Sequence, residues 1–141
     1  RANFSTGINF ASGGCGLLNS TGQGLNVMSF NHQIWQFTHF ASTLVKKEGR
    51  FAVESYLSKS LYCISVGGND LVRYMLNSTY QNTTTPQELV TFLVNKYDQY
   101  LSRLYHSGAR KFLLFDVSTL GCTPSSRLLG LQFGYSKANG G

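Results

Sequence analysis

Two short apolar runs separated by one long helical pattern constrain the fold of this chain more than any other feature. The runs are SLYCISVGG, residues 60–68, and RKFLLFDV, residues 110–117. Continuous apolar runs of this length are typical of strands buried on both faces of a parallel sheet, whose strands are joined by crossover helices. We therefore expect Cys63, which lies inside the first run, to be a buried free thiol.

The segment between the two runs carries the clearest helix signal. Thr85 can cap this helix, Pro86 suits its first turn, and Glu88 completes a Thr-x-x-Glu capping box. Gly108 is placed to end it. The expected buried stripe consists of Val90, Leu93, Tyr97, Leu101 and Leu104.

Upstream, the sequence predicts two more helices and one more strand. A first helix ends at Gly49 and buries the face formed by Phe30, Ile34, Phe37, Ala41 and Leu44. FAVESYLSK, residues 51–59, predicts a second, shorter helix. GINFAS, residues 7–12, alternates loosely and predicts a short strand. Strands that alternate with helices predict an α/β domain, with helices on both faces of a parallel sheet.

Each expected strand is followed by a loop of unusual composition. The loops are GGCG (13–16), GGND (67–70) and STLGCTPSSR (118–127). Because ligands of parallel sheets bind beyond the carboxyl ends of the strands, we expect all three loops at one edge of the sheet.

The GGND loop offers suitable chemistry for a site. Gly67 and Gly68 let a ligand approach the backbone closely. Asn69 presents an uncharged N–H donor, which suits an oxygen that gains negative charge during a reaction. Asp70 is placed to cap the helix that follows. Gly, Asn and Asp are also the commonest turn residues, so the residues alone leave a simple turn open.

Several other functions do not fit the sequence. A dinucleotide fingerprint fails because Gly14-Cys15-Gly16 is followed by Asn19 where glycine is required, and no acidic residue occurs before Glu48. A backbone N–H from Gly14 remains available to a ligand. No Gly-x-Ser-x-Gly elbow is present. The histidines His32, His39 and His106 are interpreted as surface residues.

The amino-acid composition further restricts the functional classes to which the protein can belong. The net charge is +6, but Lys and Arg come singly or in pairs, which indicates solvated surface charge rather than a nucleic-acid site. The three cysteines lack metal-ligand spacing, and no apolar stretch reaches the roughly 20 residues of a membrane span. The chain opens on Arg1, which suggests a processed or truncated product. Four sequons favour a secreted glycoprotein; their asparagines are Asn3, Asn19, Asn77 and Asn82.

Three blocks, taken together and in order, resemble a known family. GINFASGGCGLL, SVGGNDL and GARKFLLFDVSTLGCTPSSR are similar to blocks of the plant GDSL esterase/lipase family, within the SGNH hydrolase superfamily. The resemblance covers essentially the whole chain. It implies a three-layer α/β/α, flavodoxin-like domain. It also implies a secreted carboxylic ester hydrolase that acts on acyl or lipid esters through a serine acyl-enzyme, without cofactor or metal.

The resemblance also assigns roles to residues. Gly14, through its backbone, and Asn69, through its side chain, would be the oxyanion donors. The loops around them would be shaped by Gly13, Gly16, Gly67, Gly68 and Asp70. Cys122 would pair with a cysteine further downstream.

Two blocks of the family pattern are not found. The chain contains no Gly-Asp-Ser-Leu, and none of Asp70, Asp98 and Asp116 is followed three residues later by His. We therefore expect residues 1–141 to be a partial domain, incomplete at both ends, that lacks the nucleophile block and the Asp-x-x-His block. The alternative is a non-catalytic truncated product that at most binds acyl or glycan-acyl ligands.

Overall fold

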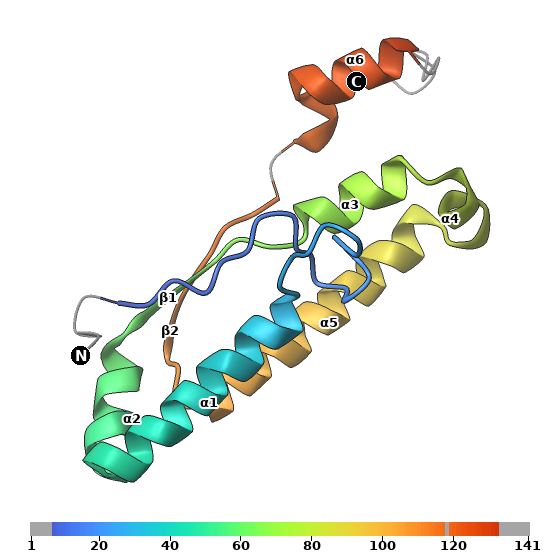
Figure 1. The fold of residues 1–141 in the computed structure, drawn as a ribbon. Helices are drawn as coiled ribbons and strands as arrows, with labels where there is room; N and C mark the ends of the chain where they lie inside the picture. Colours follow the sequence, from blue (N-terminus) through green and yellow to red (C-terminus); the bar gives the residue numbers. More distant parts are fainter. Residues whose placement is uncertain (1–6, 118, 133–141) are drawn as a thin grey trace.

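The computed structural model describes residues 7–117 and 119–132. Its elements, in chain order, are α1 (Phe30–Glu48), α2 (Arg50–Lys59), β1 (Leu61–Ile64), α3 (Gly68–Met75), α4 (Ser78–Thr83), α5 (Pro86–His106), β2 (Lys111–Leu114), the short 3₁₀ helix η2 (Leu120–Cys122) and α6 (Pro124–Gln132). Helices α1 and α5 pack against each other beside the two strands, and α3 continues from the end of β1 (Figure 1).

The two strands form a parallel pair. Leu61 is opposite Lys111, and Ile64 is opposite Leu114. The ladder continues for one more bond, in which the Phe115 N–H donates to the Ile64 carbonyl at 2.9 Å. Helix α5 lies in the connection between the strands, as a parallel pair requires. The predicted parallel α/β class is confirmed.

One face of this strand pair is covered by helices. Tyr62 points to that face, where its ring meets Phe37 edge-on at 5.4 Å between ring centroids and lies 5.7 Å from Phe112. Burial, together with nearby Tyr56, raises the pKa of Tyr62 to about 12, although Arg110 opposes the shift. Ile64 is buried on the same face.

In the described residues, no helix packs on the opposite face of the strand pair. Leu61 and Leu113 are exposed there, and so is Cys63. The prediction of a buried Cys63 thiol is therefore wrong, because no described helix covers that face. The described part of the chain thus shows one helical layer of the expected three-layer domain.

The expected strand over residues 7–12 is also not observed. The segment runs beside β1 in Figure 1, but no backbone hydrogen bond joins it to a neighbouring strand among the described residues. A strand exists only with a partner that completes its hydrogen bonds, so this segment has no ladder.

Helix α5 begins as predicted. Thr85 Oγ1 accepts from the Glu88 N–H at 3.3 Å, while the Thr85 N–H donates to Glu88 Oε2 at 2.8 Å, which completes the capping box. The predicted buried stripe is partly wrong, because Leu89 is buried and Val90 is 44% exposed. The helix is thus rotated by about one residue at its start. The residues that it buries are Leu89, Leu93, Tyr100 and Leu104.

Helix α1 matches its prediction more closely. It ends at Glu48, and Gly49 at its C-cap has φ of 85°. The buried residues Phe30, Ile34, Phe37 and Ala41 lie on the expected face, whereas Leu44 is only half-buried. Residues 118–127, expected as a loop, instead include η2 and the start of α6.

The stripe of α5 yields a stability prediction. Leu89→Ala should lower the free energy of unfolding by about 2–5 kcal/mol, because it leaves a cavity at a side chain that is 1% exposed. Val90→Ala, on the exposed side of the same turn, should cost no more than about 0.5 kcal/mol. Urea unfolding followed by far-ultraviolet circular dichroism measures both changes. Equal costs for the two variants would contradict the observed rotation of the helix.

Candidate functional site

The glycine-rich segment between residues 12 and 28 folds into a compact set of turns. The Cys15 N–H donates to the Ser12 carbonyl at 3.3 Å, and the Met28 N–H donates to Ser12 Oγ at 3.0 Å. Gly14 has φ of 87°, in the left-handed region that favours glycine. A Cβ at Gly22 would lie 2.7 Å from the Gly14 carbonyl oxygen, so the turns pack too closely to admit a side chain there.

The buried carboxylate of Asp70 holds this segment in place. Asp70 is 1% exposed and accepts from the Leu17 N–H at 2.8 Å, the Leu18 N–H at 3.0 Å and Thr21 Oγ1 at 2.7 Å. Three donors compensate the desolvation of the charge, and they come from a segment about 50 residues away in sequence. The Asp70 side chain therefore ties the glycine segment to the first turn of α3.

The predicted role of Asp70 as a helix cap is wrong. The N-cap of α3 is Gly67, with φ of 112° and no side-chain cap bond. Asp70 lies three residues further on, where its carboxylate satisfies N–H groups of the glycine segment instead of those of its own helix. Gly16 is needed for this contact, because a Cβ there would lie 2.6 Å from the Asp70 carboxyl carbon.

Asn69 is brought to the glycine segment by the same arrangement. Its side-chain Nδ2 donates to the Cys15 carbonyl at 2.8 Å, and the side chain is otherwise exposed. An amide nitrogen carries two hydrogens, so one N–H is used and, as far as the described residues show, the second stays free for a ligand. The bond to Cys15 also fixes which end of the amide is the donor.

Gly14 lies one residue before the carbonyl that orients Asn69. Among the described residues, no group accepts from the Gly14 N–H. The structure therefore places the two expected donors, Gly14 and Asn69, on segments that are joined by the Asn69–Cys15 and Asp70 hydrogen bonds.

The residue that precedes the third loop lies at the same edge of the sheet. The side chain of Val117, just after β2, would meet a Cβ at Gly67 at 3.5 Å and one at Gly68 at 3.9 Å. The loops at residues 13–16 and 67–70 therefore lie together, whereas the gathering of the third loop, residues 118–127, with them stays a prediction. Ser118 lies outside the described residues.

A tyrosine of α5 contacts the glycine-rich segment. The Tyr100 hydroxyl donates to the Leu17 carbonyl at 3.2 Å, and its ring packs edge-on against Phe30 at 5.2 Å. Burial raises the pKa of Tyr100, with Asp70 adding to the shift and Arg103 opposing it. The sequence did not single out Tyr100 or Thr21, because neither contact follows from local spacing.

The histidines lie elsewhere and are exposed. His32 and His39 flank Trp35 on α1, with ring centroids 5.2 and 5.4 Å from that of Trp35. His106 Nδ1 lies 2.6 Å from the Ser102 carbonyl at the end of α5. Within residues 7–117 and 119–132, no three His, Cys, Asp or Glu side chains converge as metal ligands would.

Comparison with known proteins identifies related sequences. A family model described as GDSL-like Lipase/Acylhydrolase matches residues 1–139. Among curated proteins of Arabidopsis thaliana, GDSL esterase/lipase At5g55050 is 36% identical over 123 residues, covering 86% of this chain and 32% of that protein. GDSL esterase/lipase At2g19060 is 41% identical over 123 residues, covering 84% and 34%. GDSL esterase/lipase EXL5 is 33% identical over 129 residues, covering 91% and 36%.

The chain therefore spans about a third of the length of the curated relatives it matches. No solved structure shows a significant match to it.

The contact between Gly16 and Asp70 yields a second prediction. Gly16→Ala should displace the Asp70 carboxylate and cost about 1–3 kcal/mol, because the buried donors lose their acceptor. Hydrogen exchange should accelerate at the Leu17 and Leu18 amides. Gly13→Ala is the matched control, since nothing lies within 4 Å of a Cβ there. Unchanged exchange in Gly16→Ala would show that Asp70 does not hold the segment.

Proposed function

The chain belongs to the GDSL-like lipase/acylhydrolase family, and from this premise we propose that it forms the oxyanion-binding part of a serine ester hydrolase. The hydrogen bond from Asn69 Nδ2 to the Cys15 carbonyl carries the proposal. That bond orients the amide beside Gly14 and leaves one N–H free. The substrates are small-molecule or lipid esters, and the site needs no metal or cofactor.

In this proposal the chain stabilises the charge that develops during acyl transfer. A serine hydroxyl attacks the ester carbonyl carbon, a histidine takes the serine proton, and the carbonyl oxygen becomes an oxyanion. The Gly14 N–H and the free Asn69 N–H donate to that oxygen. Donors held in place beforehand need no reorganisation at the moment of reaction, and each is worth about 3 kcal/mol.

The serine, histidine and acid of this reaction belong to a part of the domain outside these 141 residues. A hollow of about 490 Å³ supports that assignment. It lies between residues 7–12 and β1, which share no backbone hydrogen bond in the described residues. A groove between two extended segments whose facing edges are unpaired is suited to a missing element.

The free edge of β1 indicates what kind of element fills the hollow. Ile64 directs its carbonyl to β2, so its neighbours Cys63 and Ser65 direct their N–H and C=O groups the other way. Among the described residues, nothing bonds to those groups. In the proposed whole domain, a parallel strand occupies this edge, and its carboxyl end lies near Cys15 and Val66, beside the donors.

We place the protein in the secretory pathway. Asn19, Asn77 and Asn82 head three of the sequons and are all exposed, whereas Asn3 lies outside the described residues. None of the helices in the described part of the chain has the length and apolarity to cross a membrane.

The partial-domain proposal predicts the behaviour of the chain by itself. Residues 1–141 alone should hydrolyse p-nitrophenyl acetate and longer p-nitrophenyl esters no faster than a heat-denatured control. The physical reason is that donors without a nucleophile bind a carbonyl but form no acyl-enzyme. Turnover that a serine-directed fluorophosphonate abolishes would contradict the partial domain.

The oxyanion role of Asn69 predicts a specific kinetic change. In a chain that joins residues 1–141 to a nucleophile block and an Asp-x-x-His block, Asn69→Ala should lower kcat by roughly 10²–10³ with little change in KM. Asn82→Ala is the matched control, because Asn82 is exposed on α4, away from the site. An unchanged kcat in Asn69→Ala would remove this residue from the oxyanion site.

A further inference from the structure

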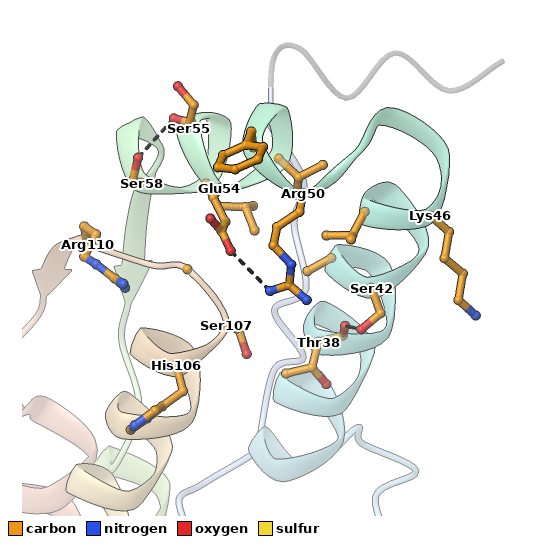
Figure 2. A pocket seen from close by; sticks show the side chains of 16 residues that line it. Thr38, Ser42, Lys46, Arg50, Glu54, Ser55, Ser58, His106, Ser107 and Arg110 are labelled. Carbon is orange, nitrogen blue, oxygen red and sulfur yellow. Dashed lines mark hydrogen bonds and ion pairs between the residues drawn. The ribbon is translucent and has the colours of Figure 1, made fainter.

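A second hollow lies at the other end of the strands. Its volume is about 810 Å³, and it is formed by the second half of α1, by α2 and by the turn that follows α5 (Figure 2). Helix α2 leads into β1, and the α5 turn leads into β2, so this hollow is at the amino end of the sheet. Asn69 follows the carboxyl end of β1, so the two sites are well separated.

Cationic side chains outnumber acidic ones around this hollow. Its lining includes Lys46, Arg50 and Arg110, but Glu54 is the one acid among the lining residues. With three cations and one acid, the net charge of the lining is +2. Glu54 is paired with Arg50 at 3.3 Å. Arg110 is far from Lys46 and Arg50 in the sequence, and the fold brings all three to this hollow.

The position of Lys46 is explained by its contribution to helix stability, but the position of Arg50 is not. Lys46 is in the last turn of α1, where a cation interacts favourably with the helix dipole. Arg50 is the first residue of α2, where the positive end of the dipole disfavours it. It also precedes Glu54 by four residues, which is the less favourable order for such a pair. In Figure 2 its guanidinium extends into the hollow.

Arg110, on the opposite wall, is held rigidly. Its guanidinium lies 4.0 Å from the centroid of the Tyr105 ring. Its Nη1 donates to the carbonyls of Tyr105 and Ala109 at 2.6 and 2.7 Å. Within the described part of the chain, these bonds leave Nε and Nη2 free to donate, in the planar arrangement that matches a carboxylate.

Hydroxyl groups on the walls supply acceptors. Four Ser and Thr hydroxyls donate to backbone carbonyls: Thr38 to Trp35, Ser42 to Thr38, Ser58 to Ser55, and Ser107 to Arg103, at 2.8–3.1 Å. A hydroxyl has one hydrogen and two lone pairs, so each of these oxygens can still accept. The hollow thus combines cationic donors with neutral acceptors.

We propose that this hollow binds an acidic carbohydrate, an oligosaccharide that carries carboxylates. Arg50 and Arg110 bind a carboxylate, and wall hydroxyls such as Ser42 accept from the sugar hydroxyls. An acidic peptide offers comparable charge but only one backbone N–H donor per carboxylate, whereas each unit of an acidic sugar chain also carries more than one hydroxyl, which can donate to these acceptors. The volume suits a ligand of several sugar units. This site is independent of the ester-hydrolase proposal.

The first experiment compares ligands of equal charge. Calorimetric titration of the 141-residue chain, at about 50 mM salt, uses oligogalacturonate, oligoglutamate with the same number of carboxylates, and neutral dextran. Oligogalacturonate should bind about 10-fold more tightly than oligoglutamate, because each sugar unit offers more donors to the wall hydroxyls than each glutamate does. Dextran should not bind measurably. Equal affinity for the two anions, or tighter binding to anionic phospholipid vesicles, would overturn the proposal.

Variants then locate the site. Arg50→Gln and Arg110→Gln should each weaken oligogalacturonate binding about 10-fold, the loss expected for one charge-assisted contact. Arg127→Gln on α6 makes the same change of charge far from the hollow and should have less than about a twofold effect. Ser42→Ala should weaken binding of oligogalacturonate more than binding of oligoglutamate.

Circular dichroism of each variant verifies the fold, and a heat-unfolded sample measures binding by charge alone. Equal losses in Arg127→Gln and Arg50→Gln, or full binding by the unfolded chain, would show diffuse attraction instead of a site.

Discussion

The candidate site depends on one buried carboxylate. The segment from residue 12 to residue 28 has no helix or strand, so little besides turns and side-chain contacts defines its shape. Asp70 gives it a fixed point by accepting two backbone N–H groups and one hydroxyl in a place that water does not reach. Leaving such donors unpaired would cost about 1–3 kcal/mol each, so the segment and α3 hold each other in register. The relative positions of the Asn69 amide and the Gly14 backbone depend on that contact.

The parts of the fold that follow from local chemistry could be predicted from the sequence. The capping box of α5 involves only Thr85 and Glu88, which are three residues apart. Strands β1 and β2 lie within runs of consecutive apolar residues, which are also visible in the sequence. The role of Asp70 could not be predicted this way, because its partners lie about 50 residues earlier. The one-residue error in the α5 stripe has a similar origin: Val90 and Leu89 are both apolar, and only tertiary packing decides which of them is buried.

The errors at Cys63 and residues 7–12 share a different cause. Both expectations assumed a completed sheet with helices on each face, and each would hold only if further elements were present. In the described residues, β1 has one partner and one covered face. The open edge of β1 and the exposed Leu61–Leu113 face are therefore two signs of the same incompleteness. A chain that spans about a third of its relatives is expected to show such surfaces.

The GGND segment first admitted two interpretations, a turn and a donor loop, and the two are compatible in the structure. Gly67 adopts a left-handed conformation that ends the extension of β1 and begins α3 at Gly68. Only because the chain turns there does Asn69 lie in the first turn of a helix, facing the Cys15 carbonyl. The same turn sends Asp70 inward to the glycine segment. A turn by itself requires neither the buried Asp70 carboxylate nor the hydrogen bond from Asn69 to the Cys15 carbonyl, so the donor role proposed for Asn69 accounts for more of this segment than a turn does.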